Sequence, residues 1–445
     1  MKYLRGKMAA FRVSLEKLVS PEIRVRRRSL SSFHIFGCTG LALAALLALS
    51  LVTRIGLSPW VMVSIILTAV ATFLILVMAT KILTGEERII NYHHIIAVTA
   101  VSALLLKLLN QPILPYLDIT ILGLGLFTAC GRVGCLMGGC CHGRPCQWGV
   151  CYRQEHVAAG FTSYLAGVRL FPIQAVESLW LLCVVAVGSA LILSGHRPGE
   201  ALAWYVTAHA LGRFNFEFAR GDAERPYYLG FSQPQWISLF LLIGITWAEL
   251  VEILPFHYWH LGAVILVILI MVSLSLKRHF QKTPKYELRH PRHLKEVAEA
   301  IHMISRPAAQ IASPGAPQDV SQNIRITHTS LGIQLSAGKI NDDAGDIRHF
   351  ALSSHSGTMT EETAEIVADM ILKLKYPSGS SELTSGNRGI FHLLIRSGDQ
   401  SDEDKPERTG EMSELPIYRP ELRQEVVDGL LYTHSRSCQN HSSPL

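Results

Sequence analysis

Two groups of residues in this sequence have the types and spacing to do chemistry. The first is the segment GRVGCLMGGCCHGRP at positions 131–145, which combines Arg132 and Arg144 with three cysteines and several glycines. Glycine lets the backbone turn sharply and approach a ligand closely. Arginine binds phosphate through a planar, permanently charged fork of donors. The segment therefore predicts an anion-binding turn, a metal site or a redox centre.

The second group lies on one predicted helix. His209, Arg213, Glu217 and Arg220 follow one another at intervals of four, four and three, which places them on one helical face. Two arginines against one acid leave a positive surplus, and a surplus inside an apolar segment favours an anionic ligand. The alternative is a buried ladder of ion pairs that only orders the helices.

A third segment, FPIQAVESLW, places Gln174 and Glu177 on one face of another helix, because they are three residues apart. Gly134 and Gly143 bring backbone close to the arginines of the first group. Together the three segments predict a positively charged, glycine-lined pocket at one end of a helix bundle. Its natural occupant is a phosphate, which within a membrane indicates a phospholipid headgroup.

The composition indicates a membrane protein. Hydrophobic residues make up 49% of the 445 residues and charged residues only 17%, whereas a soluble domain has about 25% charged residues. A helix needs roughly 17–25 apolar residues to cross a bilayer. The sequence thus predicts an all-α polytopic membrane protein with about 7–8 transmembrane helices. The apolar runs lie at 33–53, 58–80, 92–109, 116–137, 173–194, 200–219, 235–252 and 260–276.

Beyond the last apolar run the composition becomes that of a soluble module. Apolar and polar residues alternate around 324–335, which favours short strands, and Thr358 with Glu361 forms a possible capping box before an apolar helical stripe. This region has no catalytic motif, so we expect an accessory domain whose partner the sequence does not identify. The predicted domains are a basic segment at 1–30, a transmembrane domain at 31–278, a linker or helix at 279–321, a small soluble α+β domain at 322–397 and a disordered tail at 398–445.

The motifs resemble those of the bacterial prolipoprotein diacylglyceryl transferases over about residues 33–252. The family signature G-R-x-G-N-F-x-N-G-E-x-x-G-R resembles residues 131–144, from Gly131 and Arg132 to Gly143 and Arg144. The family's arginine–glutamate–arginine helix matches Arg213, Glu217 and Arg220, and its P-S-Q-x-x-E segment matches Pro172, Ile173, Gln174 and Glu177.

The resemblance implies transfer of the diacylglyceryl group from phosphatidylglycerol to the thiol of a lipobox cysteine in a prolipoprotein, in the bacterial inner membrane, with no cofactor and no nucleic acid. Arg132 and Arg213 are expected to hold the phosphate, and Glu217 to hold Arg213. The substrate-binding residues that it implies are Arg144, Gly134, Gly143, Gln174, Glu177, His209 and Arg220.

This sequence departs from the family at several positions. Cys135 and Gly138 replace the two signature asparagines, and Cys140 replaces the glutamate. The family's histidine in an H-G-G segment aligns with Tyr92, and one gap would restore His93. The catalytic base is therefore left open between Tyr92, His93, His94 and His209.

The cysteines leave alternatives. No metal is expected, but Cys135 with Cys140 and Cys146 with Cys151 have a spacing that zinc sites use. A thiol–disulfide relay, a disulfide of Cys140 with Cys146 that closes the loop, and simple packing are also possible. The rival functions are thus a related membrane protein with thiol-redox or zinc chemistry, or a non-catalytic phospholipid-binding scaffold.

The membrane orientation is open as well. Arginines at 24 and 26–28 precede the first apolar run, and Lys277 and Arg278 follow the eighth. The positive-inside rule would place both ends, and with them the 131–145 segment, in the cytoplasm. The family resemblance instead implies a site that faces outward.

Overall fold

The structure is a computed structural model, and it describes part of the chain. The expected disordered tail at 398–445, most of the basic segment and half of the linker lie outside the described residues. These residues are 18–25, 28–85, 91–280, 285–304, 326–342, 345–355, 357–376 and 379–396.

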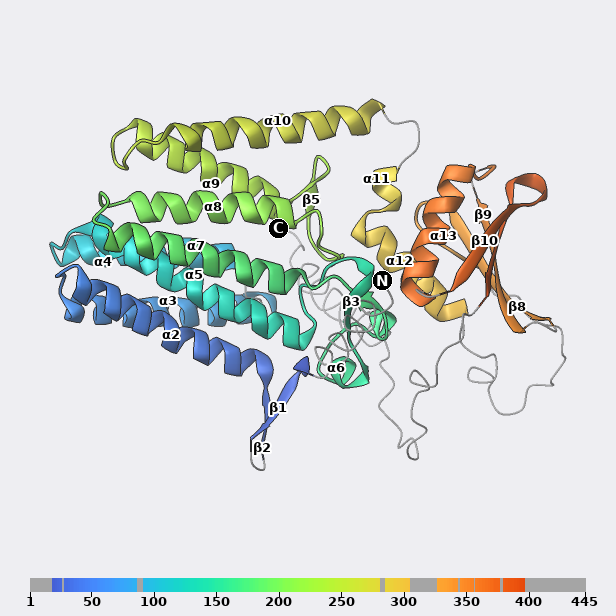
Figure 1. Cartoon of the computed structure of the whole chain (residues 1–445), viewed down its shortest axis with the longest axis horizontal. Helices are drawn as coiled ribbons and strands as arrows, with labels where there is room; N and C mark the ends of the chain where they lie inside the picture. Colours follow the sequence, from blue (N-terminus) through green and yellow to red (C-terminus); the bar gives the residue numbers. More distant parts are fainter. Residues whose placement is uncertain are drawn as a thin grey trace, which may run out of the picture. The chain divides into compact units, whose positions relative to one another are not determined.

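Among the described residues, a helix lies at each of the eight apolar runs, and Figure 1 shows these helices side by side. Five of them, α2, α3, α5, α7 and α10, are long and apolar enough to cross a membrane. The protein is thus a mostly helical chain with several apolar helices, and the count of seven or eight spans stays a prediction. The helices are α2 (Ser32–Arg54), α3 (Pro59–Thr84), α4 (Asn91–Leu108), α5 (Ile113–Gly138), α7 (Ile173–Leu193), α8 (Glu200–Phe216), α9 (Gln233–Leu250) and α10 (Tyr258–Phe280).

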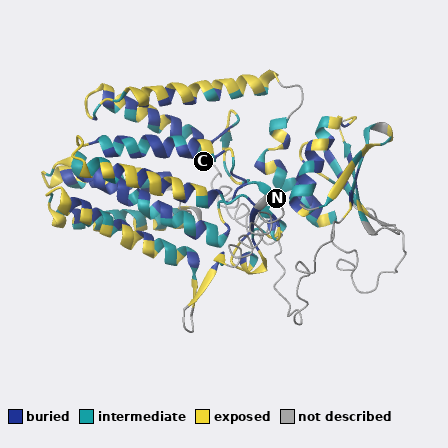
Figure 2. Ribbon diagram, viewed as in Figure 1, coloured by how far each residue is buried: buried dark blue, intermediate teal, exposed yellow. Residues whose placement is uncertain are grey.

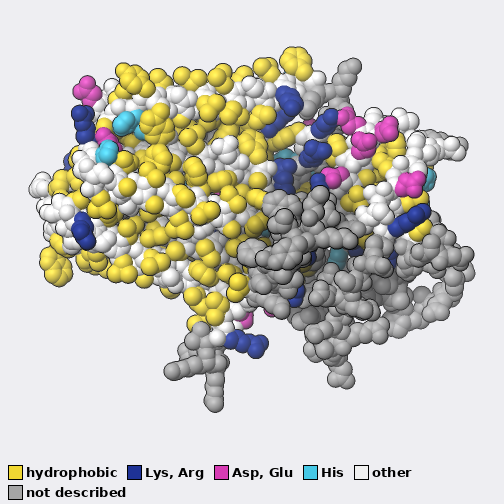
Figure 3. Space-filling view, in the orientation of Figure 1, with side chains coloured by type: hydrophobic (Ala, Val, Ile, Leu, Met, Phe, Trp, Pro, Cys, Tyr) yellow, Lys and Arg dark blue, Asp and Glu magenta, His cyan; other side chains and the backbone are white. Residues whose placement is uncertain are grey.

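The outer faces of these helices are apolar. Leu67, Leu74 and Ile82 of α3 and Leu269 of α10 are more than half exposed. Figure 2 shows exposed residues along the outward faces, and Figure 3 shows hydrophobic side chains covering most of the visible face of the helical region. Exposed apolar surface on this scale is unfavourable in water. It therefore supports contact with lipid.

Helix α5 occupies the centre of the bundle. Of the five apolar helices it is the most buried, because 61% of the residues in its 18-residue apolar stretch are buried. It packs against α2, α7 and α8. A Cβ at Gly125 would lie 2.4 Å from the ring of Tyr205 on α8. Glycine therefore lets these two helices approach closely, and both carry candidate site residues at the same end of the bundle.

Short elements connect the helices. A two-stranded pair precedes α2, and further short pairs lie in the connections before α7 and before α9. These elements are β1 (Glu22–Val25), β2 (Arg28–Ser31), β3 (Pro145–Cys151), α6 (Gln154–Ala158), the 3-10 helix Ser163–Leu165, β4 (Arg169–Leu170), β5 (Tyr227–Tyr228) and β6 (Phe231–Ser232).

The C-terminal region is rich in β-structure. An antiparallel sheet has the strand order β10-β11-β9-β8-β7, and α13 follows β9. The expected capping box of Thr358 with Glu361 is wrong, because Thr360 is the N-cap residue and accepts the hydrogen bond from Thr363 N, and Glu361 is the first residue of the helix. The elements are α11 (Lys285–Leu288), α12 (Pro291–Ile304), β7 (Ile326–His328), β8 (Ile333–Asp342), β9 (Gly345–Ser354), α13 (Glu361–Lys375), β10 (Ser380–Ser385), the 3-10 helix Asn387–Gly389 and β11 (Phe391–Arg396).

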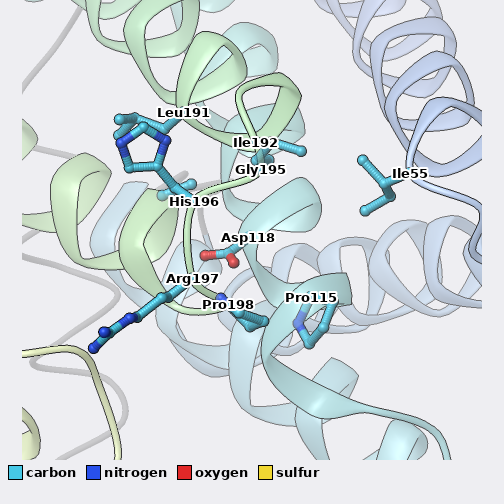
Figure 4. A pocket seen from close by; sticks show the side chains of 10 residues that line it. Ile55, Pro115, Asp118, Leu191, Ile192, Gly195, His196, Arg197 and Pro198 are labelled. Atoms are coloured by element: carbon cyan, nitrogen blue, oxygen red, sulfur yellow. The ribbon is translucent and has the colours of Figure 1, made fainter.

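A cavity of about 160 Å³ lies where α5 and α8 begin and α7 ends. Figure 4 shows Asp118 beside the segment that carries Arg197 and Pro198. The Asp118 carboxylate accepts hydrogen bonds from the backbone N–H groups of Gly199 and Leu202, both at 2.7 Å. It thereby satisfies N–H groups of the first turn of α8, which would otherwise lack partners. The Asp118 carboxylate of this cavity thus has a structural role.

We expect the substitution Asp118→Ala to lower the free energy of unfolding by about 1–3 kcal/mol, because it leaves one buried and one partly buried N–H group without acceptors. Thermal unfolding in detergent would measure the loss. Arg197→Ala is the matched control, because Arg197 lines the same cavity but is exposed. Equal stability of the two variants would contradict the capping role.

Candidate functional site

The candidate site lies where α5 and α8 end and α7 begins. This end of the bundle is opposite to the end that holds the Asp118 cavity. Arg132 lies in the last two turns of α5, Glu177 in the first turns of α7, and Arg213 near the end of α8. Because α7 packs against both α5 and α8, residues from three distant parts of the sequence meet there. All three of these side chains are at most about one-tenth exposed.

Glu177 holds the arginines together. One of its carboxylate oxygens contacts Arg213 Nη1 at 2.7 Å and Arg220 Nη1 at 3.2 Å, and the other contacts Arg132 Nε at 2.8 Å. Three cations around one buried carboxylate repel one another, and the shared negative charge offsets that repulsion. The sequence placed Glu177 among the substrate-binding residues, but its contacts are with the protein's own arginines.

Glu217 makes a second set of contacts. One oxygen lies 2.6 Å from Arg213 Nη2, four residues earlier in the chain. The other accepts from Ser232 Oγ at 2.8 Å and pairs with Arg225. Ser232 is the N-cap residue of α9, so this carboxylate links the end of α8 to the start of α9. Glu217 thus forms an ion pair with Arg213, and its expected part in holding Arg213 for a substrate stays a prediction.

The segment after α8 completes the network. The Asp222 carboxylate accepts two hydrogen bonds of 3.1 Å from Arg220, through Nε and Nη2, and one of 2.8 Å from Arg225 Nε. Burial would raise the pKa of Asp222, but the charges of Arg220 and Arg225 outweigh burial and hold that pKa below its ordinary value. Sequence reasoning missed Arg225, because it lies beyond the helical spacing that grouped Arg213, Glu217 and Arg220.

These seven side chains form one arginine–carboxylate cluster. Its members carry four positive and three negative charges, so one positive charge is not balanced within it. Arg144 lies close by, since its Nε donates to the carbonyl oxygen of Arg220 at 3.3 Å. The members are Arg132, Glu177, Arg213, Glu217, Arg220, Asp222 and Arg225.

Backbone hydrogen bonds fix the 139–145 turn against the segment after α8. Arg144 N donates to Ala219 O and Gly221 N donates to His142 O, both at 3.0 Å. A Cβ at Gly143 would lie 2.4 Å from the carbonyl oxygen of Phe171. Glycine is therefore required at 143 by the close approach of two backbones. This packing accounts for the glycine at 143 without a substrate, so the substrate contact of Gly143 stays a prediction.

Other predicted residues support the structure around the cluster. A Cβ at Gly134 would lie 3.2 Å from Phe33 Cα, so Gly134 lets α5 approach α2. Gln174 Nε2 donates to the carbonyl oxygen of Cys140 at 2.8 Å and so holds the turn. We infer that both residues act through packing and positioning.

The candidate bases are not all brought to one place. Tyr92 is buried, with its hydroxyl 3.2 Å from Ser238 Oγ and its ring against that of His209. His209 Nε2 is buried and has no hydrogen-bond partner among the described residues. His93 is exposed, and His94 packs against Phe73. Tyr92 and His209 thus lie together among buried residues, whereas His93 lies on the exposed surface of α4.

The thiols group differently from the expected zinc set. The sulfur atoms of Cys135, Cys140 and Cys141 lie within 4.8 Å of one another, whereas the spacing argument chose Cys146 and Cys151 with the first two. Cys140 is a free cysteine, so the alternative of a disulfide with Cys146 is absent from the described structure. Hydrogen bonds from the thiols of Cys135 and Cys140 hold the pKa of Cys141 below its ordinary value, with burial acting in the opposite sense and Arg220 and Arg132 in the same sense.

We expect Glu177→Gln to lower the free energy of unfolding by about 3–5 kcal/mol, because removing one partner of a buried ion pair leaves uncompensated charge. Thermal unfolding in detergent measures the change. Glu200→Gln is a matched control, since Glu200 is more exposed and lies 3.9 Å from His257. A Glu177→Gln variant as stable as the control would show that the arginines need no shared carboxylate.

Residues 35–251 match a family model described as prolipoprotein diacylglyceryl transferase. The chain is 33% identical over 137 residues to phosphatidylglycerol–prolipoprotein diacylglyceryl transferase 2 of Clostridium perfringens, which covers 30% of this chain and 50% of that protein.

Two further relatives are phosphatidylglycerol–prolipoprotein diacylglyceryl transferases. That of Dehalococcoides mccartyi (strain 195) is 36% identical over 28% of this chain and 46% of its own length. That of Clostridium tetani is 29% identical over 31% of this chain and 53% of its own length. The chain thus spans about half the length of the curated relatives it matches. Over residues 35–251, this chain resembles the prolipoprotein diacylglyceryl transferase family.

Proposed function

We propose that this protein transfers the diacylglyceryl group of phosphatidylglycerol to the cysteine thiol of a prolipoprotein lipobox. It would act as a protein of seven or eight spans in the bacterial inner membrane. The observation that carries the proposal is the arginine–carboxylate cluster, which has a buried positive surplus at the end of apolar helices. The names of the curated relatives support the same substrates.

The chemistry explains why such a cluster is useful. Phosphatidylglycerol carries one negative charge on its phosphodiester, and a second develops on the phosphate as the bond to the diacylglyceryl carbon breaks. Cations that are already in place stabilise that developing charge without reorganising. The cluster has one unbalanced positive charge for the diester, and Arg144 adds another nearby.

We assign the first phosphate contact to Arg132. Among the described residues, Glu177 is the only carboxylate within ion-pair distance of Arg132, whereas Arg213 is shared between Glu177 and Glu217. Arg132 therefore keeps more donor capacity for a ligand. In this proposal Arg213 and Arg220 add charge, while Glu177 and Glu217 keep the arginines in position.

We expect Arg132→Ala to lower the rate of diacylglyceryl transfer by about 10²–10³-fold, because it removes a charge that stabilises the leaving phosphate. The assay mixes purified protein with phosphatidylglycerol and a lipobox peptide, and follows the peptide's mass. Arg197→Ala, at the other end of the bundle, is the control and should retain full activity. Undiminished transfer by Arg132→Ala would overturn its role. Phosphatidylglycerol binding without transfer by the unsubstituted protein would favour a lipid-binding scaffold.

We propose Tyr92 as the group that takes part in proton transfer. We expect Tyr92→Phe to lower the transfer rate by about 10²-fold or more, with little change in phosphatidylglycerol affinity, because only the hydroxyl is removed. Ser238→Ala is the control, since it keeps the phenol and removes its hydrogen-bond partner. Retention of activity by Tyr92→Phe would transfer this role to His209, whose Nε2 is available.

A further inference from the structure

Three thiols converge beside the arginine–carboxylate cluster. The sulfur atoms of Cys135, Cys140 and Cys141 lie within 4.8 Å of one another. Cys135 is in the last turn of α5, which ends where Gly139 N donates to Cys135 O at 3.0 Å. Gly139 is left-handed, with φ of +82°, so the chain turns back there. The turn thus brings the next two thiols beside the first.

The backbone at Cys141 departs from the usual conformation of a cysteine. Its φ is +56°, in the left-handed region that residues with a Cβ seldom adopt. Glycine would adopt it without strain, and this segment is rich in glycine. Strained backbone at a residue with a reactive side chain is more typical of a functional position than of simple packing.

The spacing of the sulfurs suits a thiophilic cation. A zinc–sulfur bond of about 2.3 Å places the sulfurs of a tetrahedral site about 3.8 Å apart. The three thiols are near this spacing before any ligand is added. Three protein ligands are the number found in catalytic zinc sites, which keep a fourth position for a reacting group.

Charge and exposure also fit such a site. A divalent cation with three thiolates carries one net negative charge, and Arg132 and Arg220 are close enough to act electrostatically on Cys141. Cys135 is buried and Cys141 is partly buried, whereas Cys140 is exposed. The group is therefore open on one side, where a fourth ligand could approach.

We infer that Cys135, Cys140 and Cys141 bind one thiophilic divalent cation, of which Zn²⁺ is the type, and that its open position takes the thiol of the lipobox cysteine. The second part rests on the proposed function. Thiolate coordination is favourable for zinc, and a coordinated thiol loses its proton. The site would therefore supply the nucleophile that the transfer needs.

The acceptor thiol releases its proton, by way of the Tyr92 hydroxyl, to solvent when its sulfur binds the cation. The sulfur then donates an electron pair to the diacylglyceryl carbon, and a C–S bond forms as the C–O bond to phosphate breaks. Glycerol phosphate leaves with the electron pair of that bond, beside the arginines. The cation keeps its three protein thiolates and undergoes no change of oxidation state.

Metal binding is tested on full-length protein in detergent, stripped by a chelator and reloaded with Zn²⁺ or Co²⁺ alone. We expect one metal ion per chain, with cobalt showing a sulfur-to-metal charge-transfer band. Cys141→Ser and Cys140→Ser should each weaken binding by at least about tenfold, since even losing an outer-shell partner of a metal ligand costs about 10–100-fold in affinity. Cys183→Ser, an exposed thiol on α7, is the matched control. Helical circular dichroism verifies that each variant folds.

No bound metal, or equal binding by Cys141→Ser and the control, overturns the inference. So does a native thiol count that shows a disulfide within the trio, which would favour redox chemistry. Acceptor binding is measured separately: a lipobox peptide should shift the cobalt spectrum, and its Cys→Ser analogue should not. A shift without transfer refutes the proposed function and keeps the metal site. Transfer that persists in metal-free protein refutes the role of the metal in the transfer and keeps the proposed function.

Discussion

The candidate site depends on one carboxylate that three arginines share. Glu177 contacts Arg132, Arg213 and Arg220 within 3.2 Å, and these residues come from α5, α8 and the segment that follows α8. At the end of apolar helices, three unpaired cations would repel one another and favour separation of the helices. Glu177 therefore links three segments of the chain. It also supplies the negative charge that lets three arginines be buried together.

Much of the fold could be predicted from the sequence, because apolar run length is set directly by the thickness of a bilayer. Helices lie at all eight runs within the described residues. The number that cross the membrane was harder to predict, since α8 and α9 carry polar residues and α8 has only 17 residues. In the C-terminal region, alternation predicted strands, but the choice between Thr358 and Thr360 as the N-cap residue depends on backbone angles that no spacing rule contains.

The site was predictable where helical spacing applies. Arg213 and Glu217 could be grouped because residues four apart share a face, and their side chains form an ion pair. Arg225 could not, since a turn brings it back to Glu217. The thiols show the same limit. Spacing rules for zinc selected pairs four residues apart, whereas the left-handed conformations of Gly139 and Cys141 gather Cys135, Cys140 and Cys141 instead.

The turn at 139–145 is held by its backbone, and the side chains at positions 140 and 141 take no part in those backbone hydrogen bonds. Its hydrogen bonds with Phe171, Ala219 and Gly221 involve only main-chain atoms, so they are indifferent to the side chains at 140 and 141. The arginines are held by a different set of contacts. Side chains on this turn can therefore be exchanged during evolution without disturbing the backbone contacts that hold it beside the arginine–carboxylate cluster. Such independence would allow new chemistry to arise on an existing helical scaffold by single substitutions.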